Sequence, residues 1–169
     1  VKYNLGHVIK GELSLKDILV PIAEKVWLIP GGSGISELAD MSVETRQRFI
    51  SELSVLDDMV DVVLIDTGAG IQASVRDFAL ASDVVVLVTT PEPPAIKDAY
   101  GLVKSLVASG EGRVGDGLHL LVNMALSEQE AQGAADRICK VAQEYLKVHI
   151  GYLGCLRYDK RIPLAVKER

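Results

Sequence analysis

The feature of this sequence that most restricts its fold is a series of short apolar runs separated by stretches with helical spacing. The runs are rich in Val, Ile and Leu and show little polar alternation, which is typical of strands buried on both faces of a parallel sheet. They span Val26–Pro30, Val60–Asp66, Asp83–Thr90, Leu118–Met124 and Val148–Leu156. We therefore expect an α/β fold with a doubly wound, mainly parallel sheet and helices on both of its faces.

Four of the intervening stretches place apolar residues on one face of a helix. The expected helices follow Ser42, span Ala73–Ala81, span Ile96–Ala108 after a proline-rich start, and span Glu128–Leu146. Ser42 and Ser127 are candidate N-caps, and Glu130 lies three residues after Ser127, at the spacing of a capping box. Proline is tolerated in a first helical turn, so Pro93 and Pro94 favour a helix start.

Length and composition agree with one domain over residues 1–169. Hydrophobic residues make up 49% of the chain, which is too much for intrinsic disorder. The chain has 18 Lys and Arg against 23 Asp and Glu, and this balance excludes a basic nucleic-acid-binding surface as a global property. Cys139 and Cys155 match neither a metal-binding spacing nor a disulfide framework, which favours a reducing compartment. Charges interrupt every apolar run before transmembrane length, so we expect a cytoplasmic protein.

In doubly wound sheets, ligands bind at the carboxyl ends of the strands. The run that ends at Asp66 is followed by Thr67, Gly68 and Gly70. A carboxylate at a strand end can hold a hydrated Mg²⁺, and glycines allow backbone N–H groups to approach a phosphate. An Asp that caps the helix Ala73–Ala81 or closes a turn would leave the same pattern, so the residues alone leave both interpretations open.

Polar residues also follow the later runs. Thr89 and Thr90 could hydrogen-bond a phosphate or water, or they could cap the helix that the prolines begin. Asn123 has the donors and acceptors needed to read a purine edge, but it is also a common turn residue. The last run ends near Arg157 and Asp159, on the same side of the expected sheet.

Other candidate motifs favour no chemistry. Pro30–Gly34 is glycine-rich but lacks the Lys-Ser/Thr pair of a Walker loop and the dinucleotide fingerprint, so we interpret it as a flexible turn. We interpret Gly110–Gly117 in the same way. His7, His119 and His149 are scattered along the chain, which argues against a catalytic triad or a zinc site.

The order of several segments along the chain is more specific than any one of them. These segments are Tyr3–Ile9, Leu28–Gly34, Val63–Ile71, Val88–Pro93, Ile96–Tyr100 and Leu121–Asn123. Together they resemble the MinD/ParA group of P-loop ATPases, which have deviant Walker A motifs, and within it the flagellar-number regulators of the FlhG or YlxH type. The resemblance covers nearly the whole chain and implies a P-loop NTPase-like fold.

The resemblance implies a role for each matching residue. Asp66 matches the Walker B aspartate, which serves catalysis by acting on Mg²⁺ largely through water. Thr67, Gly68 and Gly70 match the switch segment near the γ-phosphate of ATP. Asn123 matches the asparagine that contacts adenine.

Two further loops match the nucleotide side of the family. Thr89, Thr90, Pro91 and Glu92 match a loop beside the nucleotide and the dimer interface. Asp159 lies in the last loop on that side.

The sequence also departs from the family pattern. Members usually carry prolines near the positions of Arg157 and Lys160, and a basic residue where Met124 stands. The family's first strand and its K-G-G-x-G-K-S/T loop precede the point where this chain starts, which is Val1 rather than Met. We therefore expect the central and C-terminal parts of a MinD-like ATPase domain, without its first strand and inactive alone.

For the full-length protein, the resemblance implies an ATPase that uses ATP and Mg²⁺ and regulates flagellum number or placement, or division-site selection. It implies an ATP-dependent homodimer, a flagellar GTPase or division-inhibitor partner, and no direct nucleic-acid binding. Reversible inner-membrane association would use a C-terminal helix beyond Arg169. The alternative is a non-catalytic, partner-binding scaffold of the same fold. A flavodoxin-like receiver fits less well because no acidic pair marks the end of an early strand.

Overall fold

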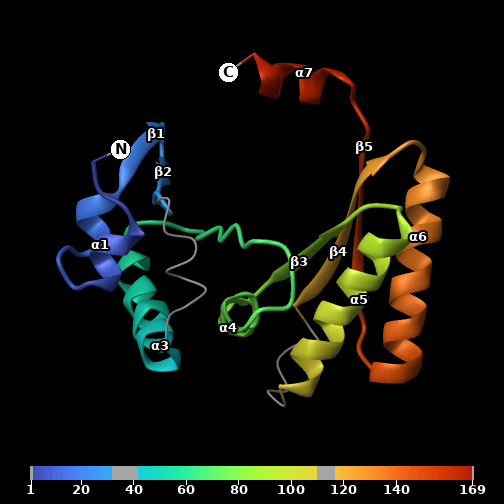
Figure 1. Cartoon of the computed structure of the whole chain (residues 1–169), viewed down its shortest axis with the longest axis horizontal. Helices are drawn as coiled ribbons and strands as arrows, with labels where there is room; N and C mark the ends of the chain where they lie inside the picture. Colours follow the sequence, from blue (N-terminus) through green and yellow to red (C-terminus); the bar gives the residue numbers. More distant parts are fainter. Residues whose placement is uncertain (1, 32–41, 110–116, 169) are drawn as a thin grey trace. The chain divides into compact units, whose positions relative to one another are not determined.

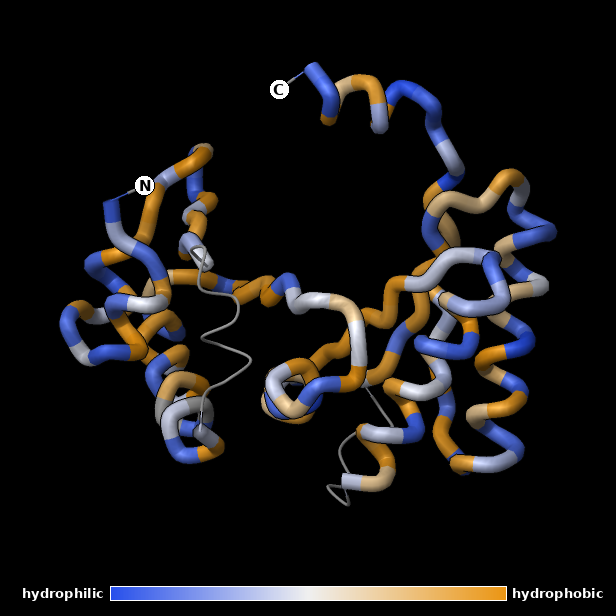
Figure 2. Tube along the Cα trace, viewed as in Figure 1, coloured by the Kyte–Doolittle hydropathy of each residue, from blue (hydrophilic) through white to orange (hydrophobic). Residues whose placement is uncertain are grey.

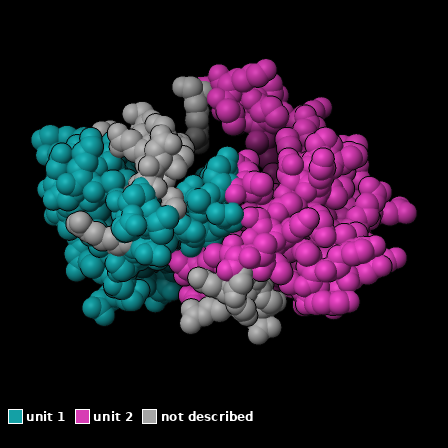
Figure 3. Space-filling view, turned by 60° about the horizontal axis from the view of Figure 1, so that its bottom comes forward, with its two compact units in different colours: residues 1–68, 72–78 teal, residues 69–71, 79–169 magenta. Residues whose placement is uncertain are grey.

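A computed structural model gives the structure of the chain and describes residues 2–31, 42–109 and 117–168. The chain divides into two compact units, residues 1–68 with 72–78 and residues 69–71 with 79–169 (Figure 3). Each unit has a hydrophobic core of its own. The single domain expected from the sequence stays a prediction.

The larger unit, residues 69–71 with 79–169, contains a three-stranded parallel sheet in the order β3-β4-β5 (Figure 1). The strands span Val85–Thr89 (β3), Leu118–Ala125 (β4) and Gly151–Arg157 (β5). Each strand overlaps a run in which the sequence predicted one. The predicted α/β class with a parallel sheet is therefore confirmed.

Two long helices connect these strands. They are α5, Pro93–Ala108, and α6, Glu128–Val141, which continues as a π-helical stretch, η3, over Ala142–Leu146. The Ser127 hydroxyl accepts a hydrogen bond from the backbone N–H of Glu130 at 3.1 Å, as predicted for the N-cap. In a capping box, the Glu130 carboxylate would accept from the backbone N–H of Ser127. Here it accepts instead from the N–H of Leu126, the preceding residue, at 2.7 Å. Glu130 therefore holds the loop before α6.

The helices α5 and α6 pack on one face of the sheet, and hydrophobic residues run along the strands (Figure 2). The buried residues of this core include Leu87, Leu120, Val122, Val103, Ala131 and Ile138. On β3 the residues alternate, because Leu87 and Thr89 are buried while Val86 and Val88 are exposed. Within this unit, α5 therefore covers one face of β3, and α6 covers β4 and β5.

A bulge in β5 sets which of its side chains enter the core. Leu120 pairs with Tyr152 and Leu121 pairs with Gly154, so one residue of β5 is left between the pairs. Gly154 has φ +114°, a conformation that glycine adopts without the steric cost of a side chain. As a result, Tyr152 and Cys155, three residues apart, both pack against the core.

The smaller unit, residues 1–68 with 72–78, is built from short elements around its own core. These are α1 (Leu5–Ile9), η1 (Leu15–Ile18), β1 (Val20–Ala23), β2 (Val26–Leu28), α3 (Val43–Glu52), η2 (Leu53–Leu56) and most of α4 (Ala73–Ala81). The Phe49 and Phe78 rings pack edge-to-face with centroids 6.0 Å apart. Ser42 caps α3 as predicted, accepting from the N–H of Thr45 at 3.2 Å.

One predicted strand is wrong, and another forms with a different pairing and burial from those predicted. Val60–Asp66 contains no strand in the described structure, and Leu64 and Val62 in it are 92% and 78% exposed. Apolar composition alone does not make a strand, because its backbone groups must pair with a neighbouring strand. Val26–Pro30 was expected to be a buried parallel strand. Instead, Val26–Leu28 is an exposed strand in an antiparallel hairpin with β1.

The remaining differences lie at the ends and in the turns of the chain. A short helix, α7, spans Arg161–Lys167 and was not predicted. Most of the predicted turns Pro30–Gly34 and Gly110–Gly117 lies outside the described residues.

Candidate functional site at the carboxyl edge of the sheet

The carboxyl ends of β3, β4 and β5 meet at one edge of the sheet because the strands are parallel (Figure 1). Five of the sequence-predicted site residues lie at or just after these ends, in the larger unit. They are Thr89, Thr90, Pro91, Asn123 and Asp159. This edge is the candidate site.

The two threonines after β3 form local hydrogen bonds. Thr89 is buried, and its hydroxyl donates to the carbonyl oxygen of Thr90 at 3.4 Å. Bonds from the Thr90 hydroxyl and from the backbone N–H of Glu92 hold the pKa of the Glu92 carboxyl below its ordinary value. Glu92 itself occupies the N-cap position of α5. The threonines therefore order the turn without capping α5, and Pro91 is half-buried between them and the helix.

Asn123 lies in a bulge of β4. Val122 pairs with Cys155 and Ala125 pairs with Arg157, so two residues of β4 oppose one residue of β5. Met124, the second bulged residue, has φ +58°, and its N–H donates to Oδ1 of Asn123 at 2.9 Å. Only the carbonyl end of an amide can accept that bond, so the side chain has a defined orientation. Its NH₂ group is the end that can donate to a ligand.

The loops that follow β4 and β5 are joined to each other. The N–H of Tyr158 donates to the carbonyl oxygen of Ala125 at 2.9 Å. Nη2 of Arg157 donates to the carbonyl oxygen of Leu126 at 3.4 Å. The sequence placed Arg157 in the polar cluster after the last strand and marked it as a departure from the family pattern. It did not predict this contact, because Arg157 and Leu126 are 31 positions apart.

Asp159 is bound by a neighbour in its own loop. Its carboxylate accepts from the backbone N–H of Arg161 at 2.9 Å and from Nε at 2.9 and 3.0 Å, and Nη2 also donates to it. The Arg161 guanidinium and the backbone N–H hold the pKa of the Asp159 carboxyl below its ordinary value. Asp159 is thus an ionised group that stabilises the start of α7. The D-x-R spacing is the sequence signal for this pair.

The other predicted residues lie at or just after the end of the segment Val60–Asp66, which forms no strand in the described structure. Asp66, Thr67 and Gly68 are exposed and belong to the smaller unit, while Gly70, with φ +119°, belongs to the larger one. Asp66 therefore belongs to a different unit from Asn123. Asp66 stays a predicted Mg²⁺ ligand.

The chemistry of this donor set suits Mg²⁺ bound together with a phosphate. Mg²⁺ in nucleotide sites is usually held by one or two carboxylates, by waters and by the phosphates themselves. Asp66 is an exposed carboxylate of this kind, and it is predicted to act on the ion through water. Within residues 2–31, 42–109 and 117–168, no group of three or more His, Cys, Asp or Glu side chains is arranged to hold a metal ion. A preformed cage of protein ligands is therefore absent from this part of the chain.

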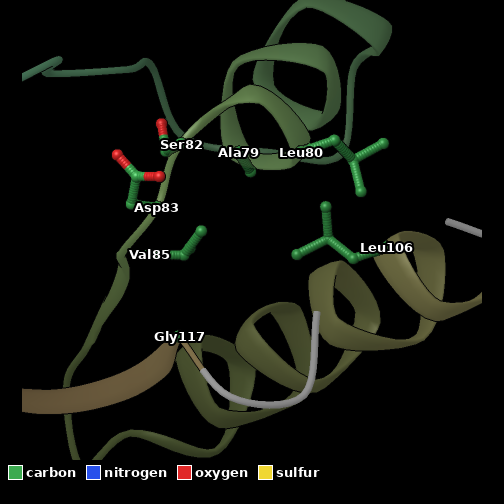
Figure 4. A pocket seen from close by; sticks show the side chains of 7 residues that line it. All are labelled: Ala79, Leu80, Ser82, Asp83, Val85, Leu106 and Gly117. Atoms are coloured by element: carbon green, nitrogen blue, oxygen red, sulfur yellow. The ribbon is translucent and has the colours of Figure 1, made fainter. Parts of the chain in front are cut away.

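A small hollow lies at the opposite, amino-terminal end of β3 (Figure 4). It is lined by Ala79, Leu80, Ser82, Asp83, Val85, Leu106 and Gly117. Its volume of about 20 Å³ accommodates a water molecule but no larger ligand. The hollow is therefore a gap in packing, and the carboxyl edge remains the candidate site.

No helix in the described part of the chain is both long and apolar enough to cross a membrane.

Comparison with known proteins identifies the relatives of this chain, although no family model matches it. Flagellum site-determining protein YlxH of Helicobacter pylori is 37% identical over 168 residues, which are 98% of this chain and 55% of the relative. Antiactivator FleN of Pseudomonas aeruginosa is 34% identical over 168 residues, covering 99% and 59%. Septum site-determining protein MinD of Thermotoga maritima is 30% identical over 116 residues, covering 66% and 41%. The chain thus spans little more than half the length of YlxH and FleN.

Two solved structures have the same fold. The cell division ATPase MinD of Pyrococcus furiosus matches 99% of this chain and 65% of its own, with a TM-score of 0.67 and 20% identity. MinD in the MinC:MinD complex of Aquifex aeolicus matches 99% and 67%, with a TM-score of 0.68 and 19% identity. The relatives and the fold together show that the chain belongs to the MinD/ParA family of P-loop ATPases, with flagellar regulators among its relatives.

Proposed function

We propose that the full-length protein containing this chain is a MinD-type ATPase that regulates the number or placement of flagella. The observation that carries this proposal is the similarity to YlxH and FleN over 98% and 99% of the chain. MinD of Thermotoga maritima is 30% identical over 66% of the chain, which is below the identity to YlxH and FleN, so we favour the flagellar role over division-site selection.

Each predicted site residue has a proposed role in this function. With ATP bound, Mg²⁺ would supply neutralisation of the phosphate charge that phosphoryl transfer needs. Asp66 would hold the waters around the ion, and Thr67, Gly68 and Gly70 would bring hydroxyl and backbone N–H groups to the γ-phosphate. Asn123 would donate from its NH₂ group to the adenine ring, because its Oδ1 already accepts from Met124.

The loops after β3 and β5 would complete the nucleotide side. Thr90, Pro91 and Glu92 would order the turn beside the nucleotide, and Thr89 would fix that turn from within the core. Asp159 would act through its pair with Arg161, which keeps the start of α7 at the same edge as Asn123.

The chain by itself should not hydrolyse ATP. Residues 1–169 contain no K-G-G-x-G-K-S/T loop, and without its backbone amides and lysines the transferring phosphoryl group lacks its main electrostatic stabilisation. The proposed activity therefore belongs to the full-length protein.

The proposal extends to assembly. An ATP-dependent homodimer that associates reversibly with the inner membrane would couple hydrolysis to position in the cell. A flagellar GTPase or a division-inhibitor-like protein would be the partner, and the MinC:MinD complex supports partner binding by proteins of this fold.

Phosphate release by the full-length protein tests the proposal. We expect Asp66→Ala to reduce the rate to near background, because the residue that holds the Mg²⁺ waters is lost. Asp61→Ala is the matched control, since Asp61 is an exposed aspartate five residues earlier in the same segment. An unchanged rate in Asp66→Ala would exclude the proposed role of Asp66.

A non-catalytic scaffold of the same fold is the second candidate. This candidate is favoured by the absence of the prolines that family members usually carry near the positions of Arg157 and Lys160. The gene upstream of Val1 discriminates between the two candidates. An in-frame K-G-G-x-G-K-S/T within about 60 residues supports the ATPase, because a strand–loop–helix unit needs about 30 residues or more. Its absence supports the scaffold.

A further inference from the structure

We infer that Arg157 is a positioning residue for the nucleotide base: it holds the β4–α6 loop in the conformation that presents Asn123. The inference rests on the proposed function, because it assigns to Arg157 a role at the same nucleotide site. It starts from the bulge of β4 and from the bonds that keep this bulge in place.

The bulge is bounded on both sides by strand pairing. Before it, Val122 pairs with Cys155, and after it, Ala125 pairs with Arg157. Asn123 and Met124 lie between these two pairs. A bulge of this kind changes the direction of a side chain relative to a regular strand. The direction of Asn123 therefore depends on where the pairing resumes, which is at Arg157.

The backbone just after the bulge is held at both of its polar groups. The N–H of Leu126 donates to the Glu130 carboxylate at 2.7 Å, and its carbonyl oxygen accepts from Nη2 of Arg157 at 3.4 Å. The adjacent carbonyl oxygen, of Ala125, accepts from the N–H of Tyr158 at 2.9 Å. Rotation of the peptide unit after Leu126 would break the bond to Arg157, so this side chain limits how far the loop can turn.

Arg157 is the member of this set that mutation can test. The bond from Tyr158 is made by backbone atoms, which a substitution leaves in place. Glu130 lies in the first turn of α6, where its backbone N–H donates to the N-cap Ser127, so replacing it would change the start of the helix as well. Replacing Arg157 removes a cationic donor from an exposed site, where little packing is lost with it.

The test uses the full-length protein and two probes, a non-hydrolysable ATP analogue and inorganic tripolyphosphate. We expect Arg157→Ala to raise the Kd for the ATP analogue and the KM for ATP about three- to tenfold, the effect of losing one hydrogen bond. The kcat should stay within about twofold, because phosphate contacts are unchanged. Arg157→Lys, which keeps a cationic donor, should recover most of the affinity. Affinity for tripolyphosphate, which has no base, should not change.

Two variants serve as controls. Arg137→Ala removes an exposed arginine from the middle of α6 and should leave the Kd, KM and kcat as in the wild type. Asn123→Ala should weaken binding of the ATP analogue but not of tripolyphosphate, since it removes the proposed base contact itself.

The outcomes separate this inference from the proposed function. If Asn123→Ala weakens ATP binding and Arg157→Ala does not, Arg157 has no positioning role while the nucleotide site stands. If Arg157→Ala weakens ATP and tripolyphosphate equally, or if Arg157→Lys recovers nothing, the inference is also overturned. If the wild type binds neither probe and releases no phosphate, the proposed function itself fails. Should Arg157→Ala not fold, Arg157→Met takes its place, because Met keeps an unbranched side chain without a donor. A Kd for the ATP analogue equal to that of Arg137→Ala would then overturn the inference.

Discussion

Gly117 occupies a position where even a methyl group should not fit. It lies just before β4, and its carbonyl oxygen accepts from the N–H of Val85 at 2.8 Å. A Cβ at this position would lie 2.3 Å from the carbonyl oxygen of Asp83 and 3.3 Å from its carbonyl carbon. Both atoms belong to the backbone, so relief requires movement of the start of β3. We expect Gly117→Ala to lower the free energy of unfolding by about 1–3 kcal/mol, the usual cost of overpacking.

Gly133→Ala is the matched control for this prediction. Gly133 is inside α6, and a Cβ there meets no atom within 4 Å. The same substitution should raise the free energy of unfolding by about 0.5–1 kcal/mol, because alanine costs less entropy than glycine in a helix. Urea denaturation with the midpoint and the m-value recorded measures both variants. If the two variants have the same stability, within about 0.5 kcal/mol, the packing argument at Gly117 is wrong.

Three further predictions concern α6, the loop before α7 and the isolated chain. Ser127→Ala should lower the free energy of unfolding by about 1 kcal/mol through loss of the N-cap, and Ser127→Asp should restore most of it; denaturation midpoints check both. Arg161 lowers the pKa of Asp159 in the folded chain. Their pair therefore stabilises the fold fully at a pH above the ordinary pKa of an aspartate, and this stabilisation is lost as the pH falls through the lower folded pKa. In an NMR titration, Arg161→Ala should shift the Asp159 midpoint upward, and an unchanged midpoint would contradict the pairing. The isolated 169-residue chain should show no significant ATP binding by calorimetry, whereas micromolar affinity would contradict the need for a phosphate loop.

Sequence reasoning predicted the elements whose signals are local. Ser42 and Ser127 marked two helix starts, the prolines marked the start of α5, and α4 has the predicted bounds Ala73–Ala81. The strands β3, β4 and β5 were predicted because their apolar runs alternate with helical stretches, which is the pattern of an α/β fold. Helix caps and apolar periodicity depend on residues close together in sequence, so they can be predicted without knowledge of tertiary contacts.

Features that depend on partners distant in sequence were missed or wrong. Val60–Asp66 has the composition of a strand, but in the described structure no strand pairs with it. The hairpin of β1 and β2 turns at Lys25, which has φ +58°. Lysine rarely adopts a positive φ, so the sequence contains no signal for this turn. The short helices α1 and α7 have too few residues for a periodic signal.

At the candidate site, Thr89, Thr90, Pro91, Asn123 and Asp159 lie at the carboxyl edge where the sequence predicted them, but their bonding was not predicted. The predicted residues from Asp66 to Gly70 instead follow a segment that forms no strand. The positive φ of Met124 orients Asn123, and the contact from Arg157 to Leu126 joins loops 31 residues apart. Neither follows from composition or spacing. The burial of Thr89 also depends on tertiary packing, which only the folded chain defines.

The central claim is that this chain contributes residues to an ATP·Mg²⁺ site in the full-length protein. Equilibrium binding of ATP to that protein, with Mg²⁺ and with Mg²⁺ removed by a chelator, tests it most directly. The account predicts that Mg²⁺ strengthens ATP binding by the wild type, and that Asp66→Ala loses this dependence while Asp61→Ala keeps it. Binding that is absent from the wild type, or equally dependent on Mg²⁺ in Asp66→Ala, would contradict the account.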